Sequence, residues 1–302
     1  MKLPASMHVF QRGWLSSNNI LFIGSGETAL VDSGYVTHAP QTVALVGHAL
    51  QGRKLDALLN THLHSDHCGG NATLQRTYSC RTLIPASEAD KVRAWDVDAL
   101  TYKATGQQCE RFGFEGTISP GDVFTLGDMA WQALAAPGHD PHSLVFFCPD
   151  ERILISADAL WENGFGVVFP ELEGESGFAE VKATLELIAS LDAKLVIPGH
   201  GAPFTEVGKA LETAFSRVEY FMADPMRNAQ NAIKVLLKFL LLEKQSIPLA
   251  QVEPLLASMF LFHEANRRYL QKPAEELAQW AVAQLVRAGA ADVQGGQLVN
   301  RE

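Results

Sequence analysis

A histidine-rich segment at residues 61–70 constrains the fold of this chain more than any other feature. It follows a short apolar run that predicts a buried strand, and its histidine and aspartate side chains have the pattern H-x-H-x-D-H. Because side chains two residues apart in an extended segment point the same way, His62 and His64 can bind one metal ion. Asp66 and His67 lie beyond the bend and can bind a second ion nearby. The chain is therefore expected to place a metal centre at the end of a strand.

Three later segments offer the further ligands that such a centre needs. Each places one side chain directly after an apolar strand: His139 in a Pro-Gly-His run, Asp158 after Ile-Leu-Ile-Ser-Ala, and His200 in Pro-Gly-His-Gly. Loops at the ends of buried strands are where binding sites are commonly assembled. His142 lies three residues from His139 and competes for its role, but the preceding glycine favours His139.

The apolar pattern around these segments predicts an α/β body with many antiparallel strands. Two short strands at 19–23 and 28–32 are expected to form a hairpin, followed by a helix at 40–52. Further antiparallel strands are expected between residues 74 and 135, with a helix at 88–95. The remaining predicted elements are a hairpin at 143–148 and 152–156, a helix capped by Ser176, a strand at 194–197, and a helix from Thr205 to Ala223.

A boundary near residue 223 divides the chain into a predicted catalytic domain at 1–222 and a C-terminal domain at 223–302. In the second part, three helical patterns are followed by two short strands joined by Gly295-Gly296. Three helices and then a small hairpin is the order of a winged helix. The helical patterns lie at 228–243, 248–261 and 274–288, and the strands at 290–293 and 297–300.

The chain carries a net charge of −10, and the acidic excess lies in its first two thirds. An acidic body argues against a polyanion bound along its surface, and the C-terminal part lacks the basic excess typical of nucleic-acid-binding domains. Arg267, Arg268 and Lys272 can contact phosphates if that part binds nucleic acid, but a solvated charged face is the favoured interpretation. Nucleic acid is therefore not the favoured partner.

Cysteine use and the lack of long apolar runs predict a cytoplasmic protein. The four cysteines, Cys68, Cys80, Cys109 and Cys148, form no C-x-x-C pair, which indicates free thiols in a reducing compartment. The first residues lack the apolar core of an export signal, and no apolar stretch is long enough to cross a bilayer. We therefore expect no membrane association.

The motifs and their order resemble the metallo-β-lactamase fold superfamily, near its glyoxalase II-like hydrolases. The resemblance covers about residues 8–210 and rests on five landmarks: Val31-Asp32-Ser33-Gly34, the H-x-H-x-D-H segment, Gly138-His139, Ala157-Asp158 and Pro198-Gly199-His200-Gly201. It implies an α/β (α+β) fold, a four-layer αββα sandwich with a dinuclear metal site at one edge. The C-terminal part is similar to the winged-helix appendage of some hydrolases of this superfamily, a few of which act on RNA.

The resemblance also implies which side chains bind the metals. His62, His64 and His139 are expected on the first ion, Asp66, His67 and His200 on the second, and Asp158 between the two. Asp32 is expected to orient a metal ligand through a hydrogen bond. These nitrogen and oxygen donors suit two divalent ions, with zinc as the favoured metal and iron or manganese as alternatives.

The chemistry that this ligand set implies is hydrolysis. Two metal ions would lower the pKa of a bridging water to about 7, so that a hydroxide can attack a polarised carbonyl or phosphoryl centre. Asp66 is the expected catalytic residue, because it can hold the proton of that hydroxide and pass it to the leaving group. The favoured substrate is a small ester, thioester or lactone-like molecule, and the C-terminal part is expected to shape the pocket or to form a homodimer contact.

Departures from the family's patterns narrow the choice of activity. β-Lactamases of this fold usually lack the bridging aspartate that Asp158 provides, which argues against β-lactam hydrolysis as the main activity. The C-terminal part does not resemble the glutathione-binding helices of glyoxalase II, and no long insert like that of the RNA-processing members lies between Asp158 and His200. Two alternatives stay open, a phosphodiesterase or endoribonuclease of the same fold and an iron-dependent oxidoreductase.

Three residues beside the motifs have two interpretations each. Cys68 follows His67 directly, but a packed thiol is favoured over a ligand or nucleophile, because the metal set is complete without it. Trp161 and Phe165 either line a substrate pocket or pack in the core.

Overall fold

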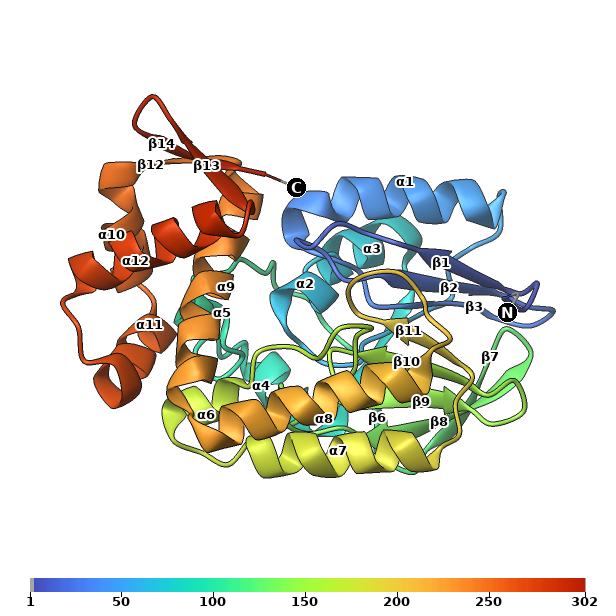
Figure 1. Cartoon of the computed structure of the whole chain (residues 1–302). Coiled ribbons are helices and arrows are strands. Elements are labelled where there is room, and N and C mark those ends of the chain that lie inside the picture. The colour runs from blue at the N-terminus through green and yellow to red at the C-terminus, as the bar shows by residue number, and fades with distance from the viewer. Residues whose placement is uncertain (1–2, 302) are drawn as a thin grey trace.

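Two mixed β-sheets face each other in the first two thirds of the chain, and a helical region with a third, small sheet lies beside them (Figure 1). The computed structural model describes residues 3–301. The first sheet has the order β1-β2-β3-β4-β5-β6, with strands at Met7–Phe10, Asn19–Ile23, Thr28–Val31, Ala57–Leu59, Arg81–Pro85 and Gly116–Ile118. The second has the order β11-β10-β9-β8-β7, with β7 at Val123–Leu126, β8 at Met129–Ala135, β9 at Leu144–Cys148, β10 at Ile153–Ala157 and β11 at Leu195–Pro198.

Both sheets combine antiparallel and parallel pairs. Strands β1, β2 and β3 pair antiparallel, whereas β4, β5 and β6 are added in parallel. Strands β7 to β10 form an antiparallel meander, and β11 pairs in parallel with β10. Parallel neighbours end at the same edge of a sheet, so the loops after β3 and β4 start side by side, and so do those after β10 and β11.

Helices connect the strands and cover the outer faces of the sheets. They are α1 (Ala39–Leu50), α2 (Ser65–Cys68), α3 (Asn71–Tyr78), α4 (Ala89–Ala94), α5 (Tyr102–Thr105), α6 (Phe169–Glu173), α7 (Phe178–Ser190) and α8 (Val207–Ala223), with 3-10 turns η1 (Val36–His38) and η2 (Ala86–Glu88). The predicted hairpins at 19–32 and 143–156 and the predicted helices at 40–52 and 88–95 are confirmed within a few residues.

Alternating side chains divide this body into layers. In β2, Ile20 and Phe22 belong to the core between the two sheets, whereas Leu21 packs with Val46 and Leu50 of α1 on the outer face. Strands β9 and β10 divide in the same way between the inner core and the outer helices α7 and α8. Figure 1 shows α1 and α3 on the outer face of one sheet and α7 and α8 on the outer face of the other.

The expectation of antiparallel strands between residues 74 and 135 is wrong for β5 and β6. Both strands pair in parallel with their neighbours. A parallel pair needs a crossover connection, and the unpredicted helix α3 carries the chain back before β5 begins. Most residues of α3 are polar, so its sequence lacks a clear apolar stripe.

The expected cap of α7 by Ser176 is also wrong. Ser176 Oγ donates a hydrogen bond to Glu180 Oε2 at 2.7 Å. Glu171 Oε1 instead accepts hydrogen bonds from the backbone N–H groups of Gly177 and Phe178, both at 2.9 Å. A carboxylate of α6 therefore satisfies the first amides of α7.

The C-terminal region is built from helices and a small antiparallel sheet around its own core. Its elements are α9 (Met226–Lys244), β12 (Ser246–Pro248), α10 (Leu249–Ala257), α11 (Phe260–Ala265), the π-helical turn η3 (Asn266–Leu270), α12 (Ala274–Arg287), β13 (Ala291–Gln294) and β14 (Gln297–Asn300). The sheet order is β12-β14-β13. The pattern predicted as one helix at 248–261 is two helices, because Met259 is extended between α10 and α11.

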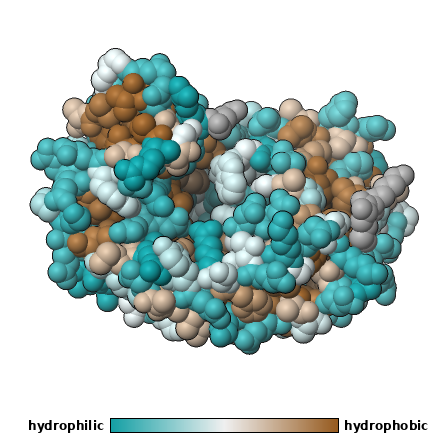
Figure 2. Space-filling view, in the orientation of Figure 1, coloured by the Kyte–Doolittle hydropathy of each residue, from teal (hydrophilic) through white to brown (hydrophobic). Residues whose placement is uncertain are grey.

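The surface of the C-terminal region carries a patch of apolar side chains, seen at the upper left in Figure 2. Leu249, Val282 and Val293 line one cavity of this region. Across residues 3–301, no helix combines the length and the apolar character needed to span a membrane.

Candidate metal centre

Seven buried histidine and aspartate side chains gather at one edge of the two sheets. The first group comprises His62, His64 and His139, and the second comprises Asp66, His67, Asp158 and His200. Within each group the candidate ligand atoms lie within 4.8 Å of one another. The structure thus brings together all seven side chains that the sequence analysis assigns to the metals.

The loops that carry these residues follow strand ends of both sheets. The histidine segment starts after β4, and the loops with Asp158 and His200 start after the parallel pair β10 and β11. A backbone hydrogen bond of 2.9 Å from Leu144 N to Thr61 O joins the two sheets at this edge. The strand ends therefore fix where each side chain begins.

The ring nitrogens of the first group converge on one another. His62 Nε2 lies 3.1 Å from His64 Nδ1, which in turn lies 2.8 Å from His139 Nε2. The outward nitrogens have acceptors, since His62 Nδ1 lies 3.1 Å from Thr61 Oγ1 and His139 Nδ1 lies 2.5 Å from Val167 O. A neutral imidazole carries one proton, so these contacts assign it to Nδ1 in both rings and leave each Nε2 lone pair pointing inward. Lone pairs that face each other favour a cation between them.

The second group contains buried nitrogens without a hydrogen-bond partner. His67 Nε2 lies 3.4 Å from Asp158 Oδ1, and neither it nor His200 Nδ1 forms a hydrogen bond within residues 3–301. His200 Nε2 lies 3.1 Å from Asp66 Oδ2 and 3.8 Å from Asp158 Oδ1. Unpartnered buried polar atoms are rare, and His67 Nε2, which lies near the Asp158 carboxylate without a hydrogen bond, fits a metal ligand.

Asp158 connects the two groups. Its Oδ2 lies 3.4 Å from His139 Nε2, and its Oδ1 lies 3.4 Å from His67 Nε2. Trp161 Nε1 donates a hydrogen bond to Oδ1 at 3.2 Å. Gly199 leaves the space for this carboxylate, because a Cβ there would overlap Oδ1 and lie 2.9 Å from His67 Cε1. One carboxylate therefore presents an oxygen to each group, as a bridging ligand must.

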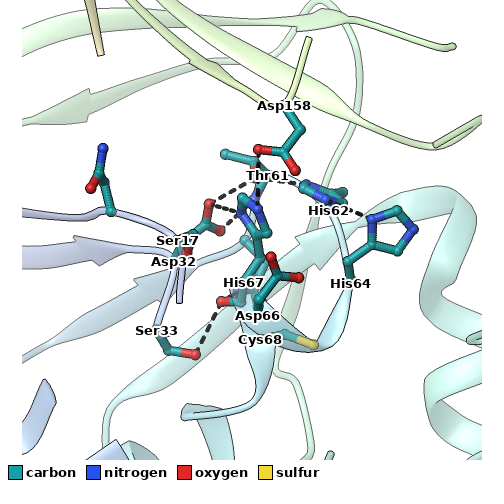
Figure 3. A network of polar contacts seen from close by, with 12 residues as sticks. Ser17, Asp32, Ser33, Thr61, His62, His64, Asp66, His67, Cys68 and Asp158 are labelled. Atoms are coloured by element: carbon teal, nitrogen blue, oxygen red, sulfur yellow. Dashed lines mark hydrogen bonds and ion pairs between the residues drawn. The ribbon is translucent and has the colours of Figure 1, made fainter. Parts of the chain in front are cut away.

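Asp32 fixes ring orientation in both groups. Its Oδ1 accepts a hydrogen bond from Thr61 N at 2.9 Å, and its Oδ2 accepts from Thr61 Oγ1 and His67 Nδ1, both at 2.8 Å (Figure 3). Because the Thr61 hydroxyl donates to Asp32, its oxygen accepts from His62 Nδ1. Asp32 has a φ of 58°, a left-handed conformation that costs a non-glycine residue about 1–2 kcal/mol. Strain of this kind is typical of residues held in place for function.

Burial and neighbouring charges set the protonation states. Burial lowers the pKa of His139 to about 4, and it lowers the pKa of His62 well below its ordinary value. Burial alone would raise the pKa of Asp158, but the charges of His67 and His200 hold it well below its ordinary value. Burial would likewise lower the pKa of His67, which Asp158 and other contacts raise well above the usual range. His62 and His139 are therefore neutral and Asp158 is ionised, which are the forms that bind metal ions, whereas His67 carries a proton that metal binding would release.

Cys68 and His142, which lie beside the candidate ligands in the sequence, do not belong to the two groups. Cys68 Sγ contacts Tyr102 OH at 3.1 Å and Leu63 O at 3.4 Å, and burial raises the pKa of this thiol well above its ordinary value. Figure 3 shows the sulfur turned away from the histidine rings. His142 belongs to neither group, and its Nε2 lies 3.5 Å from Glu88 Oε1. The two buried clusters of nitrogen and oxygen donors are consistent with a dinuclear metal site, and they suit zinc, iron or manganese.

A cavity of about 280 Å³ opens onto both groups, since His64 and His139 of the first group also line it. Asp66, Asp158 and His200 form part of its wall. The rest of the wall combines five aromatic side chains with aliphatic and polar ones and includes Trp14, Thr105, Gln107, Trp161, Phe165, Phe169, Arg217, Asn231, Val235 and Phe239. Trp161 and Phe165 therefore line the cavity, and Phe165 packs in the outer core as well. A second cavity of about 670 Å³ reaches the centre from the side of His64 and His139.

Sequence reasoning missed several residues of the wall of this cavity. Trp14 is 55% exposed, and its ring stacks on that of His200 with a centroid distance of 5.3 Å and an interplanar angle of 8°. Arg217 of α8 and Phe239 of α9 belong to helices outside every motif. A single basic or aromatic residue in a helical pattern carries no signal of its own, so only the tertiary fold reveals these positions.

Comparison with known proteins identifies a matching family and relatives that match about half of the chain. The family model described as the metallo-beta-lactamase superfamily matches residues 12–200. The hydroxyacylglutathione hydrolase of Rhodopseudomonas palustris (strain ATCC BAA-98 / CGA009) is 33% identical over 147 residues, which are 48% of this chain and 48% of that protein. The enzyme of the same name from Methylococcus capsulatus (strain ATCC 33009 / NCIMB 11132 / Bath) is 28% identical over 173 residues, 57% of this chain and 56% of that one. The chain thus matches about half the length of these curated relatives.

Solved structures share the fold over more of the chain. The metallo-beta-lactamase family protein TTHA1429 from Thermus thermophilus has a TM-score of 0.59 and 20% identity, and the match covers 99% of this chain and 100% of that chain. TTHA1623, solved in a di-iron-bound form, has a TM-score of 0.55 and 24% identity over 68% of this chain and 98% of that chain. At these identities the likeness shows the fold alone.

Proposed function

The chain belongs to the metallo-beta-lactamase superfamily, and from this premise we propose that it hydrolyses a small ester, thioester or lactone-like substrate with two divalent metal ions. The observation that carries the proposal is the position of Asp158. Its two carboxylate oxygens each lie 3.4 Å from a candidate ligand nitrogen of a different group. The cavity of about 280 Å³ beside these groups, with five aromatic side chains in its wall, supports a small organic substrate.

Asp66 is the residue we propose for proton transfer. Two divalent ions held by the two groups would supply a hydroxide at neutral pH and polarise the substrate carbonyl. Burial would raise the pKa of Asp66, but the hydrogen bond of 3.1 Å with His200 Nε2 keeps it below its ordinary value. Asp66 therefore faces the cavity as a carboxylate that can take a proton from the attacking water and return it to the leaving group.

The nature of the relatives favours the thioester among the three acyl substrates. Both curated relatives described above are named for hydrolysing acylated glutathione, which carries an acyl–sulfur bond. We propose zinc as the metal, with iron and manganese as alternatives. Iron bound in TTHA1623 supports keeping the iron-dependent oxidoreductase as a competing function.

We propose that the C-terminal region from residue 223 is a winged helix that shapes the pocket. The element order α9-β12-α10-α11-α12-β13-β14 and the antiparallel sheet β12-β14-β13 support this. Three side chains of α9, Asn231, Val235 and Phe239, line the cavity beside the metal ligands. A homodimer contact is the alternative role for this region.

In the phosphodiesterase alternative, Arg267, Arg268 and Lys272 would contact the phosphates of RNA. Arg267 and Arg268 instead pair with Glu264 at 2.5 Å and 3.1 Å, and Lys272 pairs with Glu276. Because these charges are balanced by neighbouring carboxylates, their pairing supports an acyl substrate over RNA.

A substrate panel tests the proposed function. Protein loaded with zinc, iron or manganese would be assayed on a thioester, a lactone and a phosphodiester that each release a chromogenic product. Turnover of the thioester or the lactone, lost on chelation, is the expected result. Turnover of the phosphodiester alone would overturn the acyl assignment, and two bound irons without any hydrolysis would favour the oxidoreductase.

A further inference from the structure

Arg217 is a half-buried cation in the wall of the catalytic cavity. It belongs to α8 and lines the same 280 Å³ space as Asp66 and Asp158. Its guanidinium carbon lies 5.3 Å from the ring centroid of Phe165 and 5.3 Å from that of Phe221. The apolar surroundings withdraw the charge from water, and burial lowers the pKa of the group.

This guanidinium has no hydrogen bond or ion pair within residues 3–301. Several other arginines have partners. The exposed Arg76 pairs with Glu110 at 2.6 Å, and the partly buried Arg12 donates to Asn19 Oδ1 at 2.6 Å. The described part of the chain therefore uses none of the five N–H donors of Arg217, and the side chain lines the cavity.

Lys234 of α9 adds a second cation beside Arg217. Burial lowers the pKa of Lys234, and the charge of Arg217 lowers it further, so the two groups lie within electrostatic reach. Within the described part of the chain, Lys234 has no acidic partner either. Asn231, one turn earlier on α9, lines both the catalytic cavity and the adjoining cavity that Lys234 lines. Two half-buried like charges repel each other, and an anion between them would remove that cost.

The Arg217 side chain is held before any ligand arrives. Gly164, with a φ of 126°, lies so close that a Cβ there would come 2.8 Å from Arg217 Nη1. The rings of Phe165 and Phe221 flank the same guanidinium. A planar guanidinium fixed in this way can donate two parallel hydrogen bonds to a carboxylate or phosphate.

We propose that Arg217, with Lys234 beside it, binds an anionic group that the substrate carries away from the bond to be hydrolysed. This inference rests on the proposed function, because it extends the same cavity. The substrate class is an acyl ester or thioester with a carboxylate or phosphate on its acyl part or on its leaving group.

Three matched thioesters test the anion and its source. One is the neutral butyryl thioester of N-acetylcysteamine, the second is its succinyl counterpart with a carboxylate on the acyl part, and the third is a butyryl thioester whose thiol carries a phosphate. The wild type is expected to prefer at least one anionic thioester over the neutral one by about tenfold or more in kcat/KM. Arg217→Met should reduce this ratio about tenfold, and Arg217→Lys should keep part of it.

Arg93→Met is the matched control variant. Arg93 also lies over an aromatic ring, 5.2 Å from the centroid of Phe114, but it pairs with Asp90 and is not part of the cavity wall. The ratio for this variant should equal that of the wild type. Lys234→Met gives a second test should Arg217→Met fail to fold, and a several-fold loss of the ratio is expected.

Binding of uncleavable analogues separates this inference from the proposed function. Two thioethers of the same shape, one ending in a carboxylate and one in a carboxamide, would be titrated into wild type and Arg217→Met protein of equal metal content. Tighter carboxylate binding, by about tenfold, that disappears in Arg217→Met supports the inference even if no thioester is turned over. Turnover without an anion preference, or a preference that survives in Arg217→Met and Lys234→Met, would overturn the inference and leave the hydrolase function standing.

Discussion

Two regions of the site differ in whether their polar side chains have hydrogen-bond partners within the chain. One is the edge of the sheets that carries the metal ligands, and the other is the cavity wall formed by α8 and α9. At the edge, the single carboxylate of Asp32 accepts three hydrogen bonds from Thr61 and His67. At the wall, the Arg217 guanidinium has no hydrogen-bond partner within residues 3–301. Hydrogen bonds within the chain therefore hold the ligands at the edge in place, whereas the charged Arg217 side chain at the wall can bind a ligand.

This difference indicates that chemistry and substrate choice come from separate parts of the chain. The candidate ligands lie within residues 62–200, whereas Arg217 of the wall lies on α8 and the neighbouring Lys234 lies on α9. Changes at the edge should therefore remove metal and activity together, and changes at the wall should alter substrate preference while metal remains bound.

The largest expected effect is that of Asp158→Ala. Removal of the carboxylate that spans both groups should abolish metal binding and lower kcat/KM about a thousandfold or more, because the buried histidines lose their shared partner. Metal content per chain by inductively coupled plasma mass spectrometry and turnover of a thioester measure both effects. Cys68→Ala, a buried change in the same segment, should retain its metal, and loss of metal in that variant alone would contradict the ligand assignment.

Asp32→Asn should have the next largest effect. The amide retains the shape of the carboxylate but loses its charge and one acceptor, so the rings of His62 and His67 are held less firmly. Metal affinity, measured by competition with a chromogenic chelator, should fall about tenfold to a hundredfold. Asp56→Asn is the control, since Asp56 accepts hydrogen bonds from Thr28 outside the site. Equal affinities for both variants would show that Asp32 does not orient the ligands.

His139 should make the metal-free protein less stable in acid. Its pKa in the folded protein is about 4, below its ordinary value of 6.5, so the unfolded chain binds more protons between these two values. The stability that this residue contributes is present above pH 6.5 and is lost as the pH falls toward 4. Between pH 7 and pH 5 the wild type should therefore lose about 2 kcal/mol more of its unfolding free energy than His139→Gln. Urea unfolding of protein freed of metal by a chelator measures this difference. Equal losses of unfolding free energy in the wild type and His139→Gln would contradict the assignment of a buried, neutral His139.

The smallest effect is expected at the wall. Phe239→Leu trims an aromatic side chain that lines the cavity and also contacts Tyr35, with ring centroids 5.2 Å apart. KM should rise about fivefold while metal content stays at the wild-type level. Tyr220→Leu, an exposed change on α8 outside the cavity wall, is the control. A loss of metal in Phe239→Leu would contradict the claim that metal binding depends on the edge and not on the wall.

The site at the edge could be predicted because its residues form short motifs at strand ends. His62, His64, Asp66 and His67 are nearly contiguous, and the apolar run before them marks a strand. The wall could not be predicted, because Trp14 and Arg217 lie more than two hundred residues apart and only their packing around one cavity brings them together. Their separate sequence contexts contain no sign that they line the same cavity.

The fold shows the same contrast between local and distant signals. The hairpin of β2 and β3 has a short Gly-Ser-Gly turn that marks it in the sequence. The parallel pairing of β5 with β4 depends on the crossover through α3, whose polar sequence gives no apolar stripe. Likewise, the carboxylate that caps α7 belongs to Glu171 of the preceding helix. The local sequence indicates Ser176, so the predicted cap is wrong.

Metal stoichiometry tests the central claim most directly. Protein purified without added metal, then freed of metal with a chelator, would be titrated with zinc while bound metal and thioester turnover are followed in the same samples. The two-group centre predicts that activity is absent without metal and saturates near two ions per chain. Saturation at one ion, or thioester hydrolysis that persists after complete removal of metal, would contradict it.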